Sequence, residues 1–271
     1  MTVEPTNNLA PILYLPHGGG PLPLLGEEGH GAMIRFLQAI PAELGNPDAI
    51  LVISAHWEAG RPTITGGVRP PLIYDYYGFP AEAYRIEYPV PGETQMATRI
   101  YQLLNASGFE AQLDENRGFD HGVFVPLKLM YPEATIPCVQ VSLVKGLDPG
   151  EHVRIGKALS SLRAANILTI GSGFSFHNMQ AFSFSNAIQV DDRNDSFDQW
   201  LRDTCSDPDL AADVRARRLI EWEQAEHARY CHPREEYLLP LHVCYGMAGT
   251  AASVVFNDVI LGKRATALLW S

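Results

Sequence analysis

Apolar runs alternate along the chain with segments of helical spacing. The clearest run, Ala49–Ile53, is aliphatic without interruption and rich in β-branched residues, as is typical of a strand covered on both faces. Further apolar runs predict strands at 11–15, 136–143, 166–170, 252–259 and 265–270. Helical apolar spacing predicts helices at 31–44, 94–107, 149–165, 192–205, 209–230 and 238–247. This alternation predicts an α/β fold in one domain over residues 1–271, with a central, mostly parallel or mixed sheet flanked by helices.

Three of the predicted strands end at or near a histidine. His17 follows the first strand, His56 closes the run that begins at Ala49, and His177 follows the strand at 166–170. In open α/β sheets the carboxyl ends of parallel strands meet at one edge, so we expect these side chains to converge. Convergent imidazoles with open coordination positions suit Zn(II) or non-haem Fe(II). A single histidine of this kind is more often a packed residue with a satisfied hydrogen bond, so the three carry weight only together.

Two more histidines stand next to kinked or small residues, His232 before Pro233 and His121 in a predicted loop at 116–122. The remaining four lie within or beside helical patterns, and we interpret them as surface or packed residues: His30, His152, His227 and His242. The segment 64–92 is rich in aromatic residues and proline and has no period. It is either a packed surface loop or the wall of a pocket for a flat substrate.

Composition excludes several classes of protein. Lys and Arg number 20 and Asp and Glu 31, a net charge of −11, which argues against nucleic acid or anionic membrane as a partner. The four cysteines are scattered and predict reduced thiols. The N-terminus lacks the layout of a signal peptide, and no apolar run is long enough to span a bilayer. We therefore expect a cytoplasmic protein, as a monomer or homodimer.

Competing catalytic motifs fail on inspection. There is no G-x-S-x-G nucleophile elbow, no H-E-x-x-H zinc motif and no phosphate-binding P-loop. Gly171-Ser172-Gly173 follows a strand as a dinucleotide fingerprint would, but Phe176 stands where the third glycine belongs.

Six short motifs stand in one order along nearly the whole chain: Pro16-His17-Gly18-Gly19-Gly20-Pro21, Ser54-Ala55-His56-Trp57-Glu58, Tyr77-Gly78-Phe79-Pro80, Asp120-His121-Gly122, Gly171-Ser172-Gly173 with His177-Asn178, and His232-Pro233. Together they resemble the class III extradiol ring-cleavage dioxygenases, and most closely the branch of the 4,5-DOPA dioxygenases. Better-known members of that family use two histidines and a glutamate as metal ligands. Here the third position matches a histidine, and many relatives have a serine near the first one.

The resemblance implies a mononuclear Fe(II) held by His17, His56 and His232, with Glu235 or Glu236 as alternatives for the third ligand. It implies that His177 is the acid–base residue, and in members that carry Zn(II) this residue is close enough to be a fourth ligand. His121 is implied to be a second catalytic residue near the oxygen site.

The implied substrate is O2 together with a catechol-type aromatic, DOPA-like or other, whose ring is opened. We expect Tyr77, Phe79 and Phe176 to contact that ring, with Tyr237 as a further candidate.

Two alternatives use the same histidines. A zinc hydrolase on the same fold would use metal-bound hydroxide and would stay active without O2. A metal-stabilised binding protein would lose no turnover when His177 is replaced.

Overall fold

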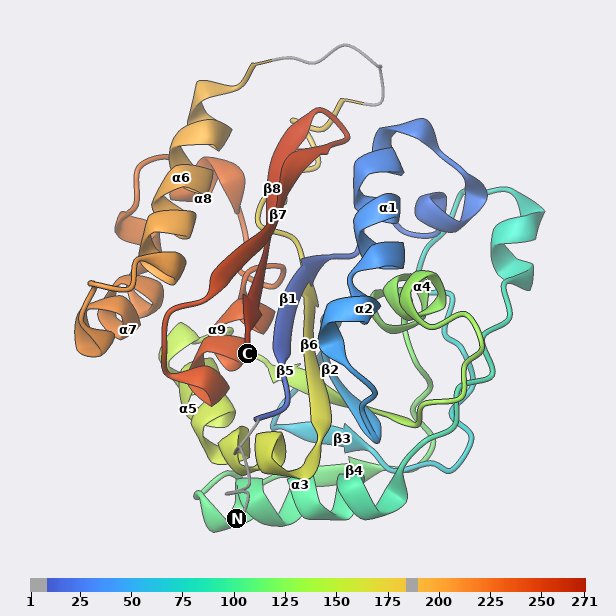
Figure 1. Cartoon of the computed structure of the whole chain (residues 1–271). Coiled ribbons are helices and arrows are strands. Elements are labelled where there is room, and N and C mark those ends of the chain that lie inside the picture. The colour runs from blue at the N-terminus through green and yellow to red at the C-terminus, as the bar shows by residue number, and fades with distance from the viewer. Residues whose placement is uncertain (1–8, 184–189) are drawn as a thin grey trace, which may run out of the picture.

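The computed structural model describes residues 9–183 and 190–271, and its centre is an eight-stranded sheet (Figure 1). The strands lie in the order β4-β3-β5-β2-β6-β1-β8-β7. Their bounds are Ile12–Pro16 (β1), Ala49–Ala59 (β2), Thr63–Thr65 (β3), Gln112–Asp114 (β4), Cys138–Val144 (β5), Ile167–Gly173 (β6), Ser253–Ile260 (β7) and Lys263–Trp270 (β8). The prediction of a single α/β domain with a mixed central sheet is confirmed.

The four central strands β5, β2, β6 and β1 run parallel to one another. The last two, β8 and β7, form an antiparallel hairpin at one side, and β8 pairs antiparallel with β1. Every residue of β1, β5 and β6 is buried, as is typical of parallel strands covered on both faces. Because β2, β6 and β1 are neighbours with one direction, their carboxyl ends lie at the same edge, as the sequence predicted.

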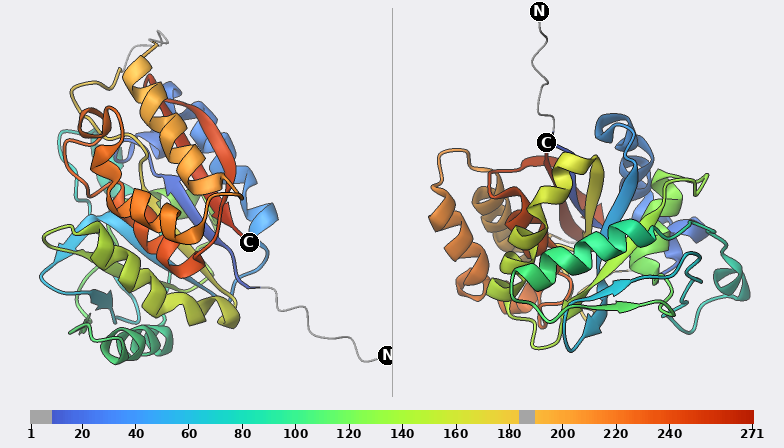
Figure 2. Two further views of the ribbon diagram at one scale, coloured as in Figure 1. Left: turned by 90° about the vertical axis from the view of Figure 1, so that its left-hand side faces the viewer. Right: turned by 90° about the horizontal axis from the view of Figure 1, so that it is seen from below.

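Helices cover both faces of the sheet (Figures 1 and 2). One face carries α1 (Gly31–Ala39), α2 (Pro41–Leu44) and α4 (His121–Met130), and the other carries α5 (Pro149–Leu159) and α9 (Leu239–Ala248), which pack on each other. The helix α3 (Thr94–Ala106) lies along the end of the sheet near β3 and β4. Outside this core lie α6 (Asp192–Ser206), α7 (Ala212–Ile220) and α8 (Ala228–Cys231). Short 3-10 turns occupy Leu22–Leu25, Glu28–His30, Ala81–Arg85, Ser160–Ala165 and Trp222–Gln224.

Three elements differ from the sequence prediction. The helix expected at 31–44 restarts at Pro41, because proline lacks the N–H that would continue it. The helix expected at 209–230 is broken, with His227 in the left-handed region at a φ of 62°. The loop predicted at 116–122 ends at Asp120, because His121 is the first residue of the helix α4. That helix is buried nearly all round, so it shows no polar face by which sequence could have identified it.

Within the described residues, no helix is both long and apolar enough to cross a membrane.

Candidate functional site

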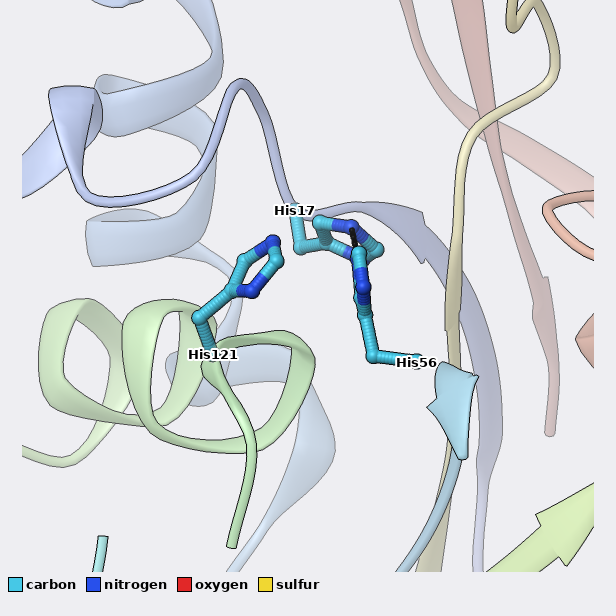
Figure 3. Close-up of side chains that lie close together, drawn as sticks. All are labelled: His17, His56 and His121. Carbon is cyan, nitrogen blue, oxygen red and sulfur yellow. Dashed lines mark hydrogen bonds between the residues drawn. The ribbon is translucent and has the colours of Figure 1, made fainter. Parts of the chain in front are cut away.

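His17, His56 and His121 meet at the carboxyl edge of the parallel strands (Figure 3). His17 follows β1, His56 lies on β2, and His121 opens α4. One ring nitrogen from each lies within 4.8 Å of the others, and the Nε2 atoms of His17 and His56 are 3.0 Å apart. His17 and His121 are buried and His56 is half-buried. Side chains from three separate segments therefore point their nitrogens at one small volume.

Ser172, at the end of β6, fixes the protonation of His17. The Ser172 hydroxyl donates to the Gly122 carbonyl at 2.5 Å, so its only proton is used. His17 Nδ1 lies 2.9 Å from the same oxygen and must donate to it. The proton of a neutral His17 is then on Nδ1, and Nε2 presents a lone pair to the cluster.

The carboxylate of Asp75 lies against the outer nitrogens of the other two histidines, His121 and His56. One carboxylate oxygen accepts from His121 Nδ1 at 2.9 Å and also from the His121 backbone N–H at 3.0 Å. The other carboxylate oxygen is 3.3 Å from His56 Nδ1. Burial raises the pKa of Asp75, but the hydrogen bond and charge of His121 and the charge of His56 outweigh it and bring the pKa to about 2. An ionised Asp75 thus accepts a hydrogen bond from the Nδ1 of His121 and lies close to the Nδ1 of His56.

Ring nitrogens of the three histidines thus face one another, and a cation between them would stabilise this arrangement. Burial, and next the neighbouring histidines, hold the pKa of both His17 and His56 well below the usual value, so protonation of these two rings does not supply that cation. Neutral imidazoles with their outer nitrogens bonded to a hydroxyl or carboxylate are what transition-metal sites use. The donor set therefore fits Zn(II) or Fe(II).

The Asp120-His121-Gly122 motif sets α4 against the sheet. Asp120 is buried and accepts hydrogen bonds from Ser54 on β2 at 2.7 Å and from Gln140 on β5 at 2.5 Å. A Cβ on Gly122 would lie 2.3 Å from Ser54 Oγ and 3.2 Å from His56 Cδ2. Glycine is needed here because any side chain would push α4 away from His56.

The glycines after His17 form one wall of the site. Gly18 has a φ of 84°, and a Cβ there would meet Pro23, His30 and Met33 below 3.0 Å. The Gly19 N–H donates to His30 Nε2 at 2.9 Å. His30 is buried, as a packed residue, and its role is to hold this loop.

His177 lies beside the cluster, stacked on Tyr237. The two rings are 3.3 Å apart between centroids with 12° between their planes. Burial lowers the pKa of His177 to about 4, so the ring is neutral near pH 7. Its Nδ1 is 3.8 Å from a carboxylate oxygen of Glu236. The Tyr237 hydroxyl lies 3.0 Å from His56 Nε2.

The structure separates His232 from this cluster. Its Nε2 donates to the Ser175 carbonyl at 2.9 Å, and its ring packs against Phe197 and Trp222. Its Nδ1 is buried without a hydrogen-bond partner, and burial lowers its pKa to about 3. Within the described residues the geometry places His121, and not His232, next to His17 and His56, and the expectation that His232 is the third ligand stays a prediction.

A cavity of about 530 Å³ opens onto the site. Tyr77 and Phe79 line it, as expected for substrate contacts, but Phe176 does not, because it is fully buried against Phe182 and Tyr230. The aromatic segment at 74–79 is thus a pocket wall along much of its length. The cavity is lined by Gly18, Gly19, Gly20, Leu22, Asp75, Tyr76, Tyr77, Phe79, His121, Phe174, His177, Met179, Phe182, Tyr237 and Leu261.

Sequence reasoning missed Asp75 and Ser172 as parts of the site. Asp75 is the one acidic residue in the aromatic stretch 73–79, and that isolation was a signal that it serves a neighbour. Ser172 interrupts a glycine pair at a strand end, where a hydroxyl can reach an adjacent strand tip.

Comparison with known proteins identifies the family. Residues 12–266 match the family described as the catalytic LigB subunit of aromatic ring-opening dioxygenase. The chain is 40% identical over 277 residues to a protein named dioxygenase tasH of Hapsidospora irregularis, covering 97% of this chain and 86% of that one. It is 40% identical over 206 residues to a 4,5-DOPA dioxygenase extradiol of Portulaca grandiflora, covering 75% and 73%.

A solved structure agrees with these sequence matches. The crystal structure of an uncharacterized protein of Escherichia coli K12 superposes with a TM-score of 0.78 at 25% identity, covering 97% of this chain and all of that one. This protein belongs to the LigB family of class III extradiol dioxygenases.

Proposed function

We propose that the protein is a metal-dependent extradiol dioxygenase that inserts O2 into a catechol-type aromatic and opens its ring. The observation that supports this most directly is the convergence of ring nitrogens from His17, His56 and His121 beside a pocket with aromatic walls. Membership of the LigB family supports the reaction class. Residence in the cytoplasm and a monomeric or dimeric state remain predictions.

His17, His56 and His121 would hold the metal through Nε2. We assign His121 to the metal because its ring nitrogen lies within 4.8 Å of those of His17 and His56, while Asp75 orients the ring by accepting from its Nδ1. When bound, the metal ion brings catechol and O2 together and polarises them. We expect Fe(II) for activity, since Zn(II) fits the same nitrogens but has no redox chemistry.

His177 is our acid–base residue. It is neutral near pH 7 and lines the cavity, so it can accept a proton from a catechol hydroxyl as the substrate binds. The Glu236 carboxylate, 3.8 Å from its outer nitrogen, stabilises the imidazolium that results. The protonated His177 can later return this proton to the substrate as the ring opens. The side chains of Tyr76 and Phe79 would enclose the ring and exclude water, with Tyr77 at the exposed rim of the cavity.

The test is reconstitution with Fe(II) under argon, followed by a catechol panel and then O2, with absorbance read for a yellow ring-opened product. We expect product only with iron and O2, and its loss in His177→Ala while iron stays bound. Protein that holds Fe(II) and gives no product with any catechol would contradict the proposal. Turnover of a hydrolysable substrate by the Zn(II) protein without O2 would instead favour a zinc hydrolase.

A further inference from the structure

Tyr237 contacts the histidine cluster directly, which the sequence did not predict. Its hydroxyl oxygen is 3.0 Å from His56 Nε2, the atom that also lies 3.0 Å from His17 Nε2. The centroid of its ring is 5.4 Å from that of His17 and 5.3 Å from that of His56. Tyr237 also lines the cavity beside His121 and His177. The Tyr237 hydroxyl therefore lies next to the nitrogen that His56 directs toward His17.

The backbone of Tyr237 is held firmly in this position. Its carbonyl accepts hydrogen bonds from the Phe174 backbone N–H and from the Tyr14 hydroxyl, both at 3.1 Å. A Cβ on Gly173 would lie 2.1 Å from the same carbonyl, so only glycine allows this approach. Stacking on His177 fixes the ring plane. The backbone hydrogen bonds and the stacking on His177 together orient the Tyr237 hydroxyl toward His56.

The spacing matches that of atoms bound to one metal. Nitrogen or oxygen donors about 2.1 Å from a metal ion lie roughly 2.9 to 3.4 Å apart in tetrahedral or octahedral sites. Both the His17–His56 and the His56–Tyr237 separations fall in this range. We propose that the oxygen of Tyr237 is a further ligand of the metal that His17, His56 and His121 hold.

Proton and charge balance agree with this assignment. Without a metal, the Tyr237 hydroxyl donates to the His56 Nε2 lone pair. With a metal bound, the His56 Nε2 lone pair would be occupied, so the Tyr237 hydroxyl would lose its acceptor and release its proton through the cavity to solvent. Three neutral imidazoles and one phenolate then carry a single negative charge, the same charge as two histidines and a carboxylate.

The inference rests on the proposed metal site, but its test needs no turnover. Wild-type protein is loaded with one Fe(II), oxidised to Fe(III) with ferricyanide, and examined by visible absorption and resonance Raman spectroscopy. A phenolate bound to Fe(III) gives a strong visible charge-transfer band with enhanced tyrosine ring modes. We expect this signature in the wild type and its loss in Tyr237→Phe, which keeps the ring that stacks on His177.

Two variants control the experiment. Tyr77→Phe removes an exposed phenol from the same cavity and should keep the signature. Tyr237→His replaces the oxygen donor by nitrogen and should lack the band while still binding metal. Affinity for Zn(II), measured by competition with a chelator, should fall at least about 10-fold in Tyr237→Phe and recover in Tyr237→His.

A wild-type ferric protein without the signature, or a signature that survives Tyr237→Phe, would overturn the assignment. Unchanged Zn(II) affinity in Tyr237→Phe would do the same. Protein that shows the signature and cleaves no catechol would refute the proposed dioxygenase and leave the Tyr237 ligand in place.

The charge of the cavity carries a second, independent inference about the substrate. Among the described lining residues none is Lys or Arg, and Asp75 is the acidic one. The described residues 178–183, which include the wall residues Met179 and Phe182, also contain no Lys or Arg. Two cations close in sequence to lining residues are already paired: Arg234 holds Glu58 at 2.6 and 2.7 Å, and Lys263 holds Asp191 at 2.5 Å.

We infer that the catechol bears an uncharged, apolar substituent rather than a carboxylate. A carboxylate enclosed by Leu22, Phe79 and Leu261 would lose its hydration and find no cation. The net charge of −11 adds long-range repulsion of anions. This inference rests on the proposed function only in taking the ligand to be a catechol.

Binding to the Zn(II) protein tests this without turnover. Calorimetry would compare 4-ethylcatechol with 3-(3,4-dihydroxyphenyl)propionate, a pair that differs by the carboxylate. We expect the neutral compound to bind at least about 10-fold more tightly, a difference of about 1.4 kcal/mol. The exposed wall residue Met179 offers a reciprocal variant, Met179→Arg, which should reduce that preference. Equal or tighter binding of the propionate by the wild type would overturn the inference.

Discussion

His17 and His56 direct their Nε2 atoms at each other across 3.0 Å, while the Nδ1 of His17 is bonded to Ser172 and the Nδ1 of His56 lies 3.3 Å from Asp75. Replacing either residue by alanine removes one lone pair and relieves the repulsion between them. We therefore predict that His17→Ala and His56→Ala lose stoichiometric metal, while the apo-proteins are no less stable than the wild-type apo-protein to within about 1 kcal/mol. Metal content and urea denaturation check both parts. Retention of one tight metal in either variant would contradict the site.

His232→Gln should separate a structural role from a ligand role. Its ring fills a buried space against Phe197 and Trp222, so we predict a loss of about 2–4 kcal/mol in the free energy of unfolding. Metal content at low temperature should stay at the wild-type value, because no bond from His232 reaches the cluster. A folded His232→Gln protein devoid of metal would show that His232 is a ligand after all.

Asp75→Asn keeps the size of the side chain and removes its charge. The amide can donate as well as accept, so the Nδ1 protons of His56 and His121 are no longer enforced. We expect metal affinity to fall about 10- to 100-fold. Because the pKa of Asp75 is about 2, the wild-type carboxylate should keep its effect down to mildly acidic pH. A metal titration at pH 7 measures the first effect, and wild-type affinity in the variant would refute it.

Gly122→Ala tests the approach of α4 to β2. Alanine normally favours a helix over glycine by about 1 kcal/mol. Here its Cβ meets Ser54 Oγ at 2.3 Å, so we predict a net destabilisation of about 1–3 kcal/mol and weaker metal binding. Gly60→Ala is a matched control, since nothing lies within 4 Å of its Cβ position. Stabilisation by Gly122→Ala would show that the helix can move away from His56 without cost.

The buried histidines make the apo-protein sensitive to acid. Burial lowers the pKa of His152 and His177 to about 4 and that of His232 to about 3, from a usual value of 6.5. Below pH 6.5 the unfolded chain binds protons that the folded chain does not, so stability must fall with pH. We predict a steady decrease in the free energy of unfolding from pH 6.5 to about 4, measured by urea denaturation. A constant value between pH 7 and 5 would contradict the burial of these rings as neutral groups.

The positions of His17 and His56 could be predicted from sequence, because buried strands are recognisable as apolar runs and the carboxyl ends of neighbouring parallel strands share an edge. The roles of Asp75 and Tyr237 could not, because these residues reach the cluster from loops whose course depends on tertiary packing. From its local sequence, a histidine directly before a proline, His232 resembles a metal ligand. Its burial against two aromatic rings from other segments gives it a different environment.

Isotope labelling tests the dioxygenase account most directly. Fe(II)-loaded protein is given 4-ethylcatechol and ¹⁸O2, and the product is analysed by mass spectrometry as soon as it forms. The account predicts a ring-opened product that contains both labelled atoms, with one O2 consumed for each catechol. A product with one label or none, or a product that forms equally under argon, would contradict it.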